Sequence, residues 1–597
     1  MASRPTDAAP GSARFDSIDR PADIGNPRME WNSDAVAEMI RRLDLKYVAL
    51  VPGASYRGLH DSIVNYLGNS NPQMMVCLHE EHAVAIAHGY AKVTDTPMAV
   101  ALHTNVGLMH ACMAVFNAWC DRKPMIIFGA NGPQDADKRR PWIEWIHTSA
   151  DHGAIVRDYT KWDDSPRSVP AVLEAALRAN QITRTAPMGP TYICLDEELQ
   201  EAKIEDDISF PDPARYAPAR AAAPRPDDVR EAADALLAAK RPMIMAGRGS
   251  RDGQAFANRV RLAELLGALV VTDLHNSAAF PSDHPLHVLE PRFHPRDQHM
   301  DAFAEADAIL SLDWMDLGGW VKRAGGPDRV PAKVIHVSVD QYIHHGWSMD
   351  YHILPVADLK VLATPDAFVT ALLAELESRG ATKPRPRGLA IENKNPDKKQ
   401  PIASGKMALR DMALIWRAFR DGRDDVSLIS MPLGWPGDCV GIDGPLDFFG
   451  SNGGAGIGAG PGIAVGAALA LKGTGRLPVA LLGDGDFSMG ANALWTASHM
   501  DIPLLVVIAN NQAYFNDVVH QDQVAVKRGR PRENKWVGQF MTEPAVDLGH
   551  LAAAYGFDGR KVADAAELMT ALEAAAKTVQ GGGRVLLDVS VTPGYAD

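Results

Sequence analysis

Short apolar runs alternate with stretches of helical periodicity along most of this chain. The first group lies between residues 31 and 201, with runs at 47–51, 98–102, 125–128 and 191–195. Runs of this length, separated by helical segments, are typical of buried strands in a parallel sheet covered by helices. The pattern therefore predicts an α/β fold with parallel sheets flanked by helices.

Two proline-rich polar segments, at residues 211–226 and 383–404, interrupt the alternation and predict linkers. The apolar runs that follow them lie at 242–245, 268–272, 308–312 and 333–339, and then at 426–429, 479–482, 504–508 and 585–589. A chain of 597 residues is long enough for several domains. The predicted organisation is a disordered tail at 1–27, domains at 28–205, 218–380 and 405–597, and a linker at 381–404.

The composition argues against several classes of function. A formal net charge of −14 disfavours nucleic-acid binding, which requires clustered Lys and Arg. No apolar run approaches the ~18 to 20 residues needed to cross a bilayer. The five cysteines are scattered without C-x-x-C spacing and indicate neither a disulfide framework nor a zinc site. We therefore expect a cytoplasmic enzyme that acts on a small-molecule substrate, with no nucleic-acid or membrane partner.

Polar residues follow two of the predicted strands of the last domain. Asp484, between two glycines, follows the run at 479–482, and Asn511 follows the run at 504–508. Ligands bind beyond the carboxyl ends of parallel strands, where glycines let backbone N–H groups approach a phosphate. Mg²⁺ prefers such oxygen ligands together with phosphate oxygens. A Gly-Asp-Gly triplet alone is a common turn, but with Asn-Asn at the next strand end it predicts a diphosphate and Mg²⁺ site.

This pairing resembles the signature of thiamine diphosphate (ThDP)-dependent enzymes, in which Gly-Asp-Gly is followed by Asn-Asn. The resemblance is to the acetohydroxyacid synthase and benzoylformate decarboxylase group, a 2-oxo acid decarboxylase family, and extends from about residue 30 to 595. It implies that the side chains of Asp484 and Asn511 and the carbonyl of Ala513 bind Mg²⁺. The residues that it assigns to the cofactor in this region are Gly483, Asp484, Gly485, Asn511 and Tyr514.

The segment at 79–92 is similar to the family segment that carries a catalytic glutamate, followed by small residues and Gly-Tyr-Ala-Arg. The resemblance selects Glu80 over Glu81. In the family this carboxylate hydrogen-bonds the aminopyrimidine ring of the cofactor, which promotes removal of the C2 proton to give the ylid. The alternative is a carboxylate that only stabilises a helix N-terminus.

The segment at 453–460 is too rich in glycine for a helix interior. It resembles the family loop in which one bulky apolar residue holds the cofactor bent, a role that falls here on Ile457. Similar glycine patterns occur in flexible or dinucleotide-binding turns. The position of the loop, ahead of Gly483 in the same domain, favours the cofactor interpretation.

His103 directly follows the predicted strand at 98–102. It resembles a histidine that faces the substrate in benzoylformate decarboxylase, and the resemblance implies proton transfer, although a lone histidine is more often structural. The chain departs from that enzyme at Ala54, which stands where the relative has a serine after Pro-Gly. Ser55 compensates only if the loop register shifts by one residue.

The resemblance also implies the order and assembly of the domains. They are a pyrimidine-binding, a central Rossmann-like and a diphosphate-binding domain. A homodimer or homotetramer with active sites at the subunit interface is implied, because in the family the glutamate of one subunit meets the diphosphate domain of another. Some relatives bind FAD or ADP in the central domain, near residues 247–250 here, but we expect an empty scaffold domain.

By the resemblance, the expected reaction is decarboxylation or carboligation of a 2-oxo acid through a C2 ylid and an enamine, as in carbon–carbon lyases and carboligases. Two alternatives stay open. A catalytically silent scaffold is disfavoured because Glu80, Asp484 and Asn511 are intact. A 2-hydroxyacyl-CoA lyase or acyl-CoA decarboxylase would need a basic pocket, for which the candidates are Arg248, Arg251, Arg292 and Arg296.

Overall fold

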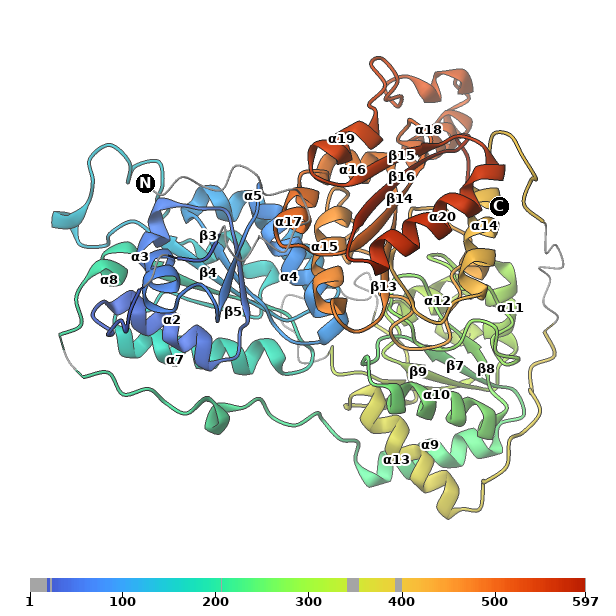
Figure 1. Cartoon of the computed structure of the whole chain (residues 1–597). Helices are drawn as coiled ribbons and strands as arrows, with labels where there is room; N and C mark the ends of the chain where they lie inside the picture. Colours follow the sequence, from blue (N-terminus) through green and yellow to red (C-terminus); the bar gives the residue numbers. More distant parts are fainter. Residues whose placement is uncertain (1–18, 22–23, 206, 341–353, 392–399, 596–597) are drawn as a thin grey trace. The chain divides into compact units, whose positions relative to one another are not determined.

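The computed structural model describes the chain except for residues 1–18, 22–23, 206, 341–353, 392–399 and 596–597. Most of the predicted tail and part of the predicted linker at 381–404 thus lie outside the described residues. The chain forms two compact units (Figure 1). The first contains the described parts of 1–219, 452–562 and 570–593, and the second those of 220–451, 563–569 and 594–597. The predicted domain limits remain a prediction.

The N-terminal part of the first unit is a six-stranded parallel sheet with the order β2-β1-β3-β4-β6-β5. Its strands are β1 (Tyr47–Leu50), β2 (Gln73–Val76), β3 (Ala99–Leu102), β4 (Met125–Asn131), β5 (Trp162–Asp164) and β6 (Pro190–Asp196). The helices of this part are α2 (Asn32–Arg42), α3 (Arg57–Asp61), α4 (Glu80–Thr94), α5 (Thr104–Cys120), α6 (Gly153–Val156), α7 (Val169–Arg184) and α8 (Glu197–Glu201). Every residue of β3 and β4 is buried, as expected of central strands covered on both faces.

The C-terminal part of the first unit contains four parallel strands that lie side by side in the order β13-β14-β16-β15. They are β13 (Leu477–Gly483), β14 (Leu504–Asn510), β15 (Asp558–Val562) and β16 (Arg584–Ser590). The helices of this region are α15 (Gly460–Leu471), α16 (Asp484–Gly490), α17 (Ala493–His499), α18 (Phe515–Arg528), α19 (Leu548–Ala554) and α20 (Ala565–Gln580). The strand β14 is buried along its whole length.

Helices α4 and α15 lie side by side and join the two parts of the first unit (Figure 1). A Cβ atom on Gly89 would overlap the carbonyl oxygen of Ile463, and one on Gly466 would overlap that of Ile86. The two glycines therefore let the helix backbones touch. Since α4 begins at Glu80, this contact fixes Glu80 relative to the C-terminal strands.

The second unit contains a five-stranded parallel sheet with the order β11-β10-β9-β7-β8. Its strands are β7 (Pro242–Ala246), β8 (Leu269–Val271), β9 (Ala308–Leu312), β10 (Lys333–Val337) and β11 (Leu359–Val361). The other elements are α9 (Pro226–Ala238), α10 (Gly253–Leu266), α11 (Asp297–Glu305), α12 (Leu317–Arg323), α13 (Pro365–Ser378), α14 (Leu409–Asp421) and β12 (Val426–Ser430). Among the described residues, no helix has the length and apolar character needed to cross a membrane.

Candidate active site

Asp484 and Asn511 lie at the carboxyl ends of two neighbouring strands. Asp484 follows β13 and Asn511 follows β14, and these strands are hydrogen-bonded to each other. The Asp484 Oδ1 atom accepts a hydrogen bond from the Gly485 N–H group at 3.0 Å, and the backbone N–H groups of Gln512 and Ala513, in the loop after β14, lie close enough to the carboxyl to lower its pKa. The structure therefore brings the two predicted strand ends together at one edge of the sheet.

The surroundings of Asp484 favour a cation. Asp484 is 5% exposed, and burial raises the pKa of its carboxyl to about 6. Its Oδ2 atom has no hydrogen-bond partner among the described residues. The Asn511 side-chain oxygen accepts a hydrogen bond from the Ala513 N–H group at 2.9 Å, so amide and carbonyl oxygens lie in the same loop. A buried carboxylate oxygen without a donor, near such oxygens, fits a hard cation such as Mg²⁺.

The glycines beside Asp484 shape the turn from β13 into α16. A Cβ atom on Gly483 would meet no other atom within 4 Å, so the space beside this residue is open. A Cβ atom on Gly485 would lie 2.8 Å from the ring of Tyr514, so the glycine lets the tyrosine pack against the turn. Both features suit a backbone that a diphosphate approaches closely.

The glycine-rich loop before α15 is held from two sides. The N–H groups of Gly458 and Gly460 donate to Asp486 Oδ1 at 2.6 and 3.4 Å. On the other side, the Gly456 N–H group donates to Asn117 Oδ1 of α5 at 3.4 Å. Ile457 lies between these anchors and is 44% exposed. The loop thus presents one large apolar side chain away from the protein core, as a cofactor support requires.

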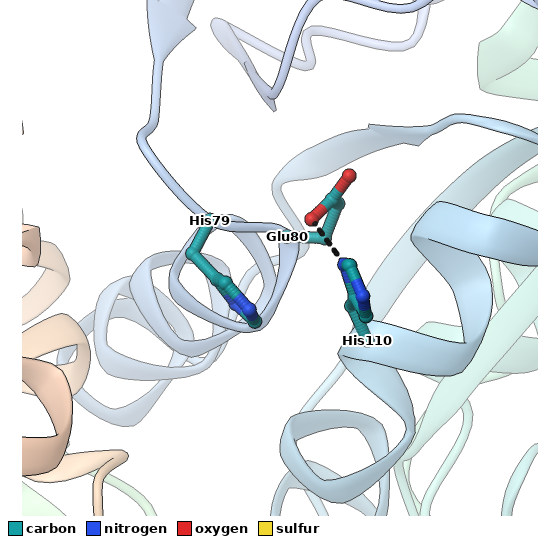
Figure 2. A group of neighbouring side chains, drawn as sticks. All are labelled: His79, Glu80 and His110. Carbon is teal, nitrogen blue, oxygen red and sulfur yellow. Dashed lines mark hydrogen bonds and ion pairs between the residues drawn. The ribbon is translucent and has the colours of Figure 1, made fainter.

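Glu80 is the first residue of α4, and its side chain is 12% exposed. Figure 2 shows its carboxylate facing His110 of α5, and His110 Nδ1 lies 3.0 Å from Glu80 Oε2. His79 Nδ1 accepts a hydrogen bond from the Glu81 N–H group at 3.2 Å and so caps the helix. The His79 ring also stacks on that of His110, with centroids 5.0 Å apart.

The neighbouring Glu81 has different surroundings. Burial raises the pKa of its carboxyl, and the negative charge of Asp486 raises it further. Glu81 therefore faces the Asp486 anchor of the glycine-rich loop, whereas Glu80 faces histidines. The choice of Glu80 over Glu81 stays a prediction, which paired substitutions can decide.

His103 lies at the same edge of the N-terminal sheet as Glu80, at the start of α5. Ser55 Oγ is 2.9 Å from His103 Nδ1 and accepts a hydrogen bond from the Thr104 N–H group at 3.3 Å. The serine hydrogen is then free to be donated to Nδ1, which leaves the proton of the neutral ring on Nε2. Burial lowers the pKa of His103, and the nearby His147 lowers it further, so the neutral ring is favoured.

Three family models match this chain. The N-terminal thiamine pyrophosphate binding domain matches residues 31–155, the central domain 229–372 and the C-terminal thiamine pyrophosphate binding domain 431–589. The chain belongs to the thiamine pyrophosphate enzyme family. Its three α/β domains with parallel sheets correspond to those of the family, which confirms the predicted fold class. The protein is therefore a ThDP-dependent enzyme of the acetolactate synthase and decarboxylase type.

Relatives of this ThDP enzyme are similar over almost their whole length. A probable acetolactate synthase large subunit from Methanocaldococcus jannaschii is 23% identical, with 94% of this chain and 92% of the relative covered. A probable 2-ketoarginine decarboxylase from Pseudomonas aeruginosa is 25% identical, with 90% and 91% covered. The solved benzoylformate decarboxylase of Polynucleobacter necessarius has a TM-score of 0.74 at 22% identity and covers 95% of this chain and 100% of its own. At this identity the structural likeness shows the fold.

Three polar residues contact the predicted site residues in ways that the sequence did not predict. His110 contacts Glu80, His147 lies with its ring centroid 4.8 Å from that of His103, and Ser55 is buried against His103. His147 lies in the loop after β4, directly after the apolar residues Trp145 and Ile146, and no motif marks it, so only its residue type could have pointed to it. Ser55 was considered only as a substitute for the serine missing at Ala54, whereas its hydroxyl contacts the imidazole.

Two of the four arginines considered for a CoA nucleotide are paired with acids. Arg248 Nη1 lies 2.8 Å from Asp340 and 3.4 Å from Asp313, and Arg292 Nη1 lies 2.6 Å from Glu290. Their positive charges are compensated within the second unit. Arg248 also belongs to the glycine-containing segment considered for FAD or ADP, where it therefore offers no uncompensated charge to a phosphate.

Proposed function

We propose that this enzyme decarboxylates a 2-oxo acid, with Mg²⁺ joining the cofactor diphosphate to the protein, and either releases the product or ligates it to a second carbonyl compound. The observation that carries the proposal is the buried Asp484 carboxylate at a strand end beside that of Asn511, because its Oδ2 atom has no hydrogen-bond partner among the described residues. Glu80 and His103 lie at one sheet edge and Asp484 and Asn511 at another, and α4 packs on α15 between them.

The residues divide into holding and proton-transfer roles. Asp484 and Asn511 through their side chains, and Ala513 through its carbonyl, would hold Mg²⁺, and Ile457 would support the thiazolium ring. When bound, ThDP supplies a carbon nucleophile and accepts the electrons of the bond that breaks. Glu80 would hold a proton at the aminopyrimidine ring of the cofactor.

His103 would donate a hydrogen bond from its Nε2–H group to the reacting substrate, and it would transfer a proton there only from the protonated ring, because a neutral imidazole that loses its proton becomes an imidazolate. Its tautomer suits this role, because Ser55 occupies Nδ1 and leaves the Nε2 proton for the substrate side. The lowered pKa keeps the ring neutral, so it acts as a hydrogen-bond donor without placing a fixed positive charge in the site. We also propose a homodimer or homotetramer with active sites at the subunit interface.

The test uses the protein loaded with ThDP and Mg²⁺. It is incubated with aliphatic and aromatic 2-oxo acids, alone and with an aldehyde acceptor, and separately with 2-hydroxyacyl-CoA esters. Carbon dioxide release from a 2-oxo acid is expected, and Asp484→Ala protein, which should not retain ThDP in calorimetry, is the control. Cleavage of the CoA esters without carbon dioxide release from any acid would contradict the proposal. Light scattering of the same samples determines the oligomeric state.

A further inference from the structure

One side of α17 contacts the segment that carries Glu80. This segment runs from Val76, the last residue of β2, to His82 in the first turn of α4, and Glu80 lies between these ends at the start of the helix (Figure 2). Thr496 Oγ1 donates a hydrogen bond to the Val76 carbonyl oxygen at 2.9 Å, and His82 Nε2 is hydrogen-bonded to Asn492 Oδ1. Asn492 and Thr496 are one helical turn apart and lie on the same side of α17. One helix thus holds both ends of the segment.

The contact with His82 is buried, and its ring is neutral. His82 is 2% exposed, and burial lowers its pKa to about 4. A neutral imidazole carries one N–H group, and the contact with an amide oxygen places it on Nε2. Nδ1 has no hydrogen-bond partner among the described residues. The bond to Asn492 is therefore the hydrogen bond that orients this ring, and it does not change with pH near neutrality.

Both α17 side chains give up a hydrogen bond within their own helix. Asn492 is at the N-cap position, where asparagine ordinarily accepts a hydrogen bond from an N–H group of the helix that follows. Among the described residues, its side-chain oxygen contacts His82 instead. Thr496 is fully buried, and a threonine inside a helix often donates to a carbonyl of the preceding turn. Its hydroxyl instead donates to Val76. Both polar groups of α17 therefore serve the segment that carries Glu80.

The other helix that packs on α4 holds it farther from Glu80. The closest backbone contacts between α4 and α15 involve Ile86 and Gly89, which lie past the first turn of α4. The ends of helices open more easily than their centres. A contact at Ile86 and Gly89 therefore fixes the body of the helix, whereas the contacts of α17 fix its first turn.

We propose that Asn492 and Thr496 are positioning residues that set the place of the Glu80 carboxylate. The proposal rests on the proposed role of Glu80 at the cofactor. The two side chains act through His82 and Val76, the residues that they contact. Loss of either contact leaves the fold in place but lets the first turn of α4 move. Because the displaced carboxylate is needed in the transition state, kcat falls while KM changes little.

The kinetic test removes the two contacts one at a time. Asn492→Ala and Thr496→Val are made in the full chain, loaded with ThDP and Mg²⁺ and assayed with the 2-oxo acid that releases most carbon dioxide from the parent. We expect each to lower kcat by about 10-fold to 10²-fold, since a misplacement of about 1 Å can cost about 10²-fold. Thr496→Ser keeps the hydroxyl and should keep most of the parental kcat. The matched control is Ser498→Ala, which removes another hydrogen bond of α17, that from Ser498 Oγ to the Tyr555 carbonyl oxygen at 2.6 Å.

A double-variant cycle tests whether the contacts act through Glu80. In a Glu80→Gln background, Asn492→Ala should lower the remaining rate by no more than about 2-fold, because the carboxylate that it positions is absent. An equal loss of kcat in both backgrounds would show that Asn492 acts elsewhere and would overturn the proposal. A fully active Glu80→Gln variant would instead refute the role of Glu80 in the proposed function, and the exchange measurement below would then decide whether α17 holds the segment.

Amide hydrogen exchange examines the segment without turnover. Peptides that cover residues 77–84 should exchange faster in Asn492→Ala and Thr496→Val than in the parent, whereas Ser498→Ala should exchange as the parent does. Melting temperatures show that each variant is folded, and if Asn492→Ala does not fold, the comparison of Thr496→Val with Thr496→Ser decides. Parental exchange of these peptides in the folded variants, or a parental kcat, would overturn the proposal.

Discussion

The ionised Asp484 should destabilise the metal-free protein, and its neutral isostere should stabilise it. Burial raises the pKa of this carboxyl from an ordinary value of 3.8 to about 6, and its Oδ2 atom has no hydrogen-bond partner among the described residues. At pH 7 the folded protein therefore holds a charge that the unfolded chain accommodates more easily. Asp484→Asn removes that charge and keeps the shape of the side chain.

The size and the sign of the effect follow from this shift. The difference between about 6 and 3.8 corresponds to about 3 kcal/mol at pH 7. Because the folded-state pKa is the higher one, between pH 4 and 6 the folded protein holds a proton that the unfolded chain has released. The stability of the metal-free parent therefore falls as pH rises through this window. Above pH 6 the full cost is present, whereas below pH 4 it is absent.

Thermal unfolding of the metal-free proteins in EDTA, at pH 5 and pH 7, measures the effect. We expect Asp484→Asn to unfold a few degrees above the parent at pH 7, about 2 to 6 °C for a protein of this size, and by less at pH 5. Addition of Mg²⁺ and ThDP should reverse the order, because a cation at Oδ2 stabilises only the parent. The control is Asp547→Asn, an exposed helix cap outside the metal loop.

Two results would refute this reasoning. Equal melting temperatures of the metal-free parent and Asp484→Asn at pH 7 would show that Oδ2 has a partner or that the carboxyl is already protonated. If the melting temperature of the parent rises from pH 5 to pH 7 while that of the variant does not, the pKa shift of Asp484 has the opposite sign.

Three further predictions concern proton transfer and packing. Glu80→Gln should lower turnover by about 10² to 10⁴-fold, and Glu81→Gln by much less; steady-state rates in the opposite order would show the predicted register to be wrong. His103→Ala should lower kcat more than it raises KM. Ser55→Ala should cause part of the same loss in kcat, whereas Ser55→Thr, which keeps the hydroxyl, should keep the parental kcat. If both alanine variants change KM alone, His103 is a binding residue. Gly466→Ala should destabilise the first unit by about 1 to 3 kcal/mol, measured as a lower melting temperature, and an unchanged value would show that α4 and α15 do not touch.

The sheet centres were predicted from the sequence, but four sheet edges were not. β4 and β14 are buried on both faces, and their sequences are therefore largely apolar. The strands that were missed, β2, β5, β11 and β15, all lie at the edges of their sheets. β5 has three residues and no buried one, and β15 has one buried residue in five. β5 and β15 give no apolar run because most of their residues are not buried, whereas the edge strand β8 is fully buried and was predicted.

The proposed site could be assigned from the sequence only where a residue belongs to a local pattern. Asp484 and Asn511 each follow a strand, and Glu80 belongs to a recognisable segment. His110 and His147 come close to Glu80 and His103 only through the packing of α5 and of the loop after β4, which no local pattern encodes. Their residue type alone could not distinguish them from ordinary surface histidines.

The geometry of the site depends on residues that take no part in its chemistry. α4 starts at Glu80, and α15 starts directly after the loop that presents Ile457, so the beginnings of two helices carry the two parts of the proposed cofactor site. Glycines at the helix contact allow the backbones to touch, and interiors packed this closely transmit a displacement instead of absorbing it. A side chain added at Gly466 would overlap the Ile86 carbonyl oxygen and displace α4, which begins at Glu80. A shift of about 1 Å in such a site can cost about 10²-fold in rate, so we expect the helix contact to matter for the position of Glu80 although its glycines take no part in the chemistry.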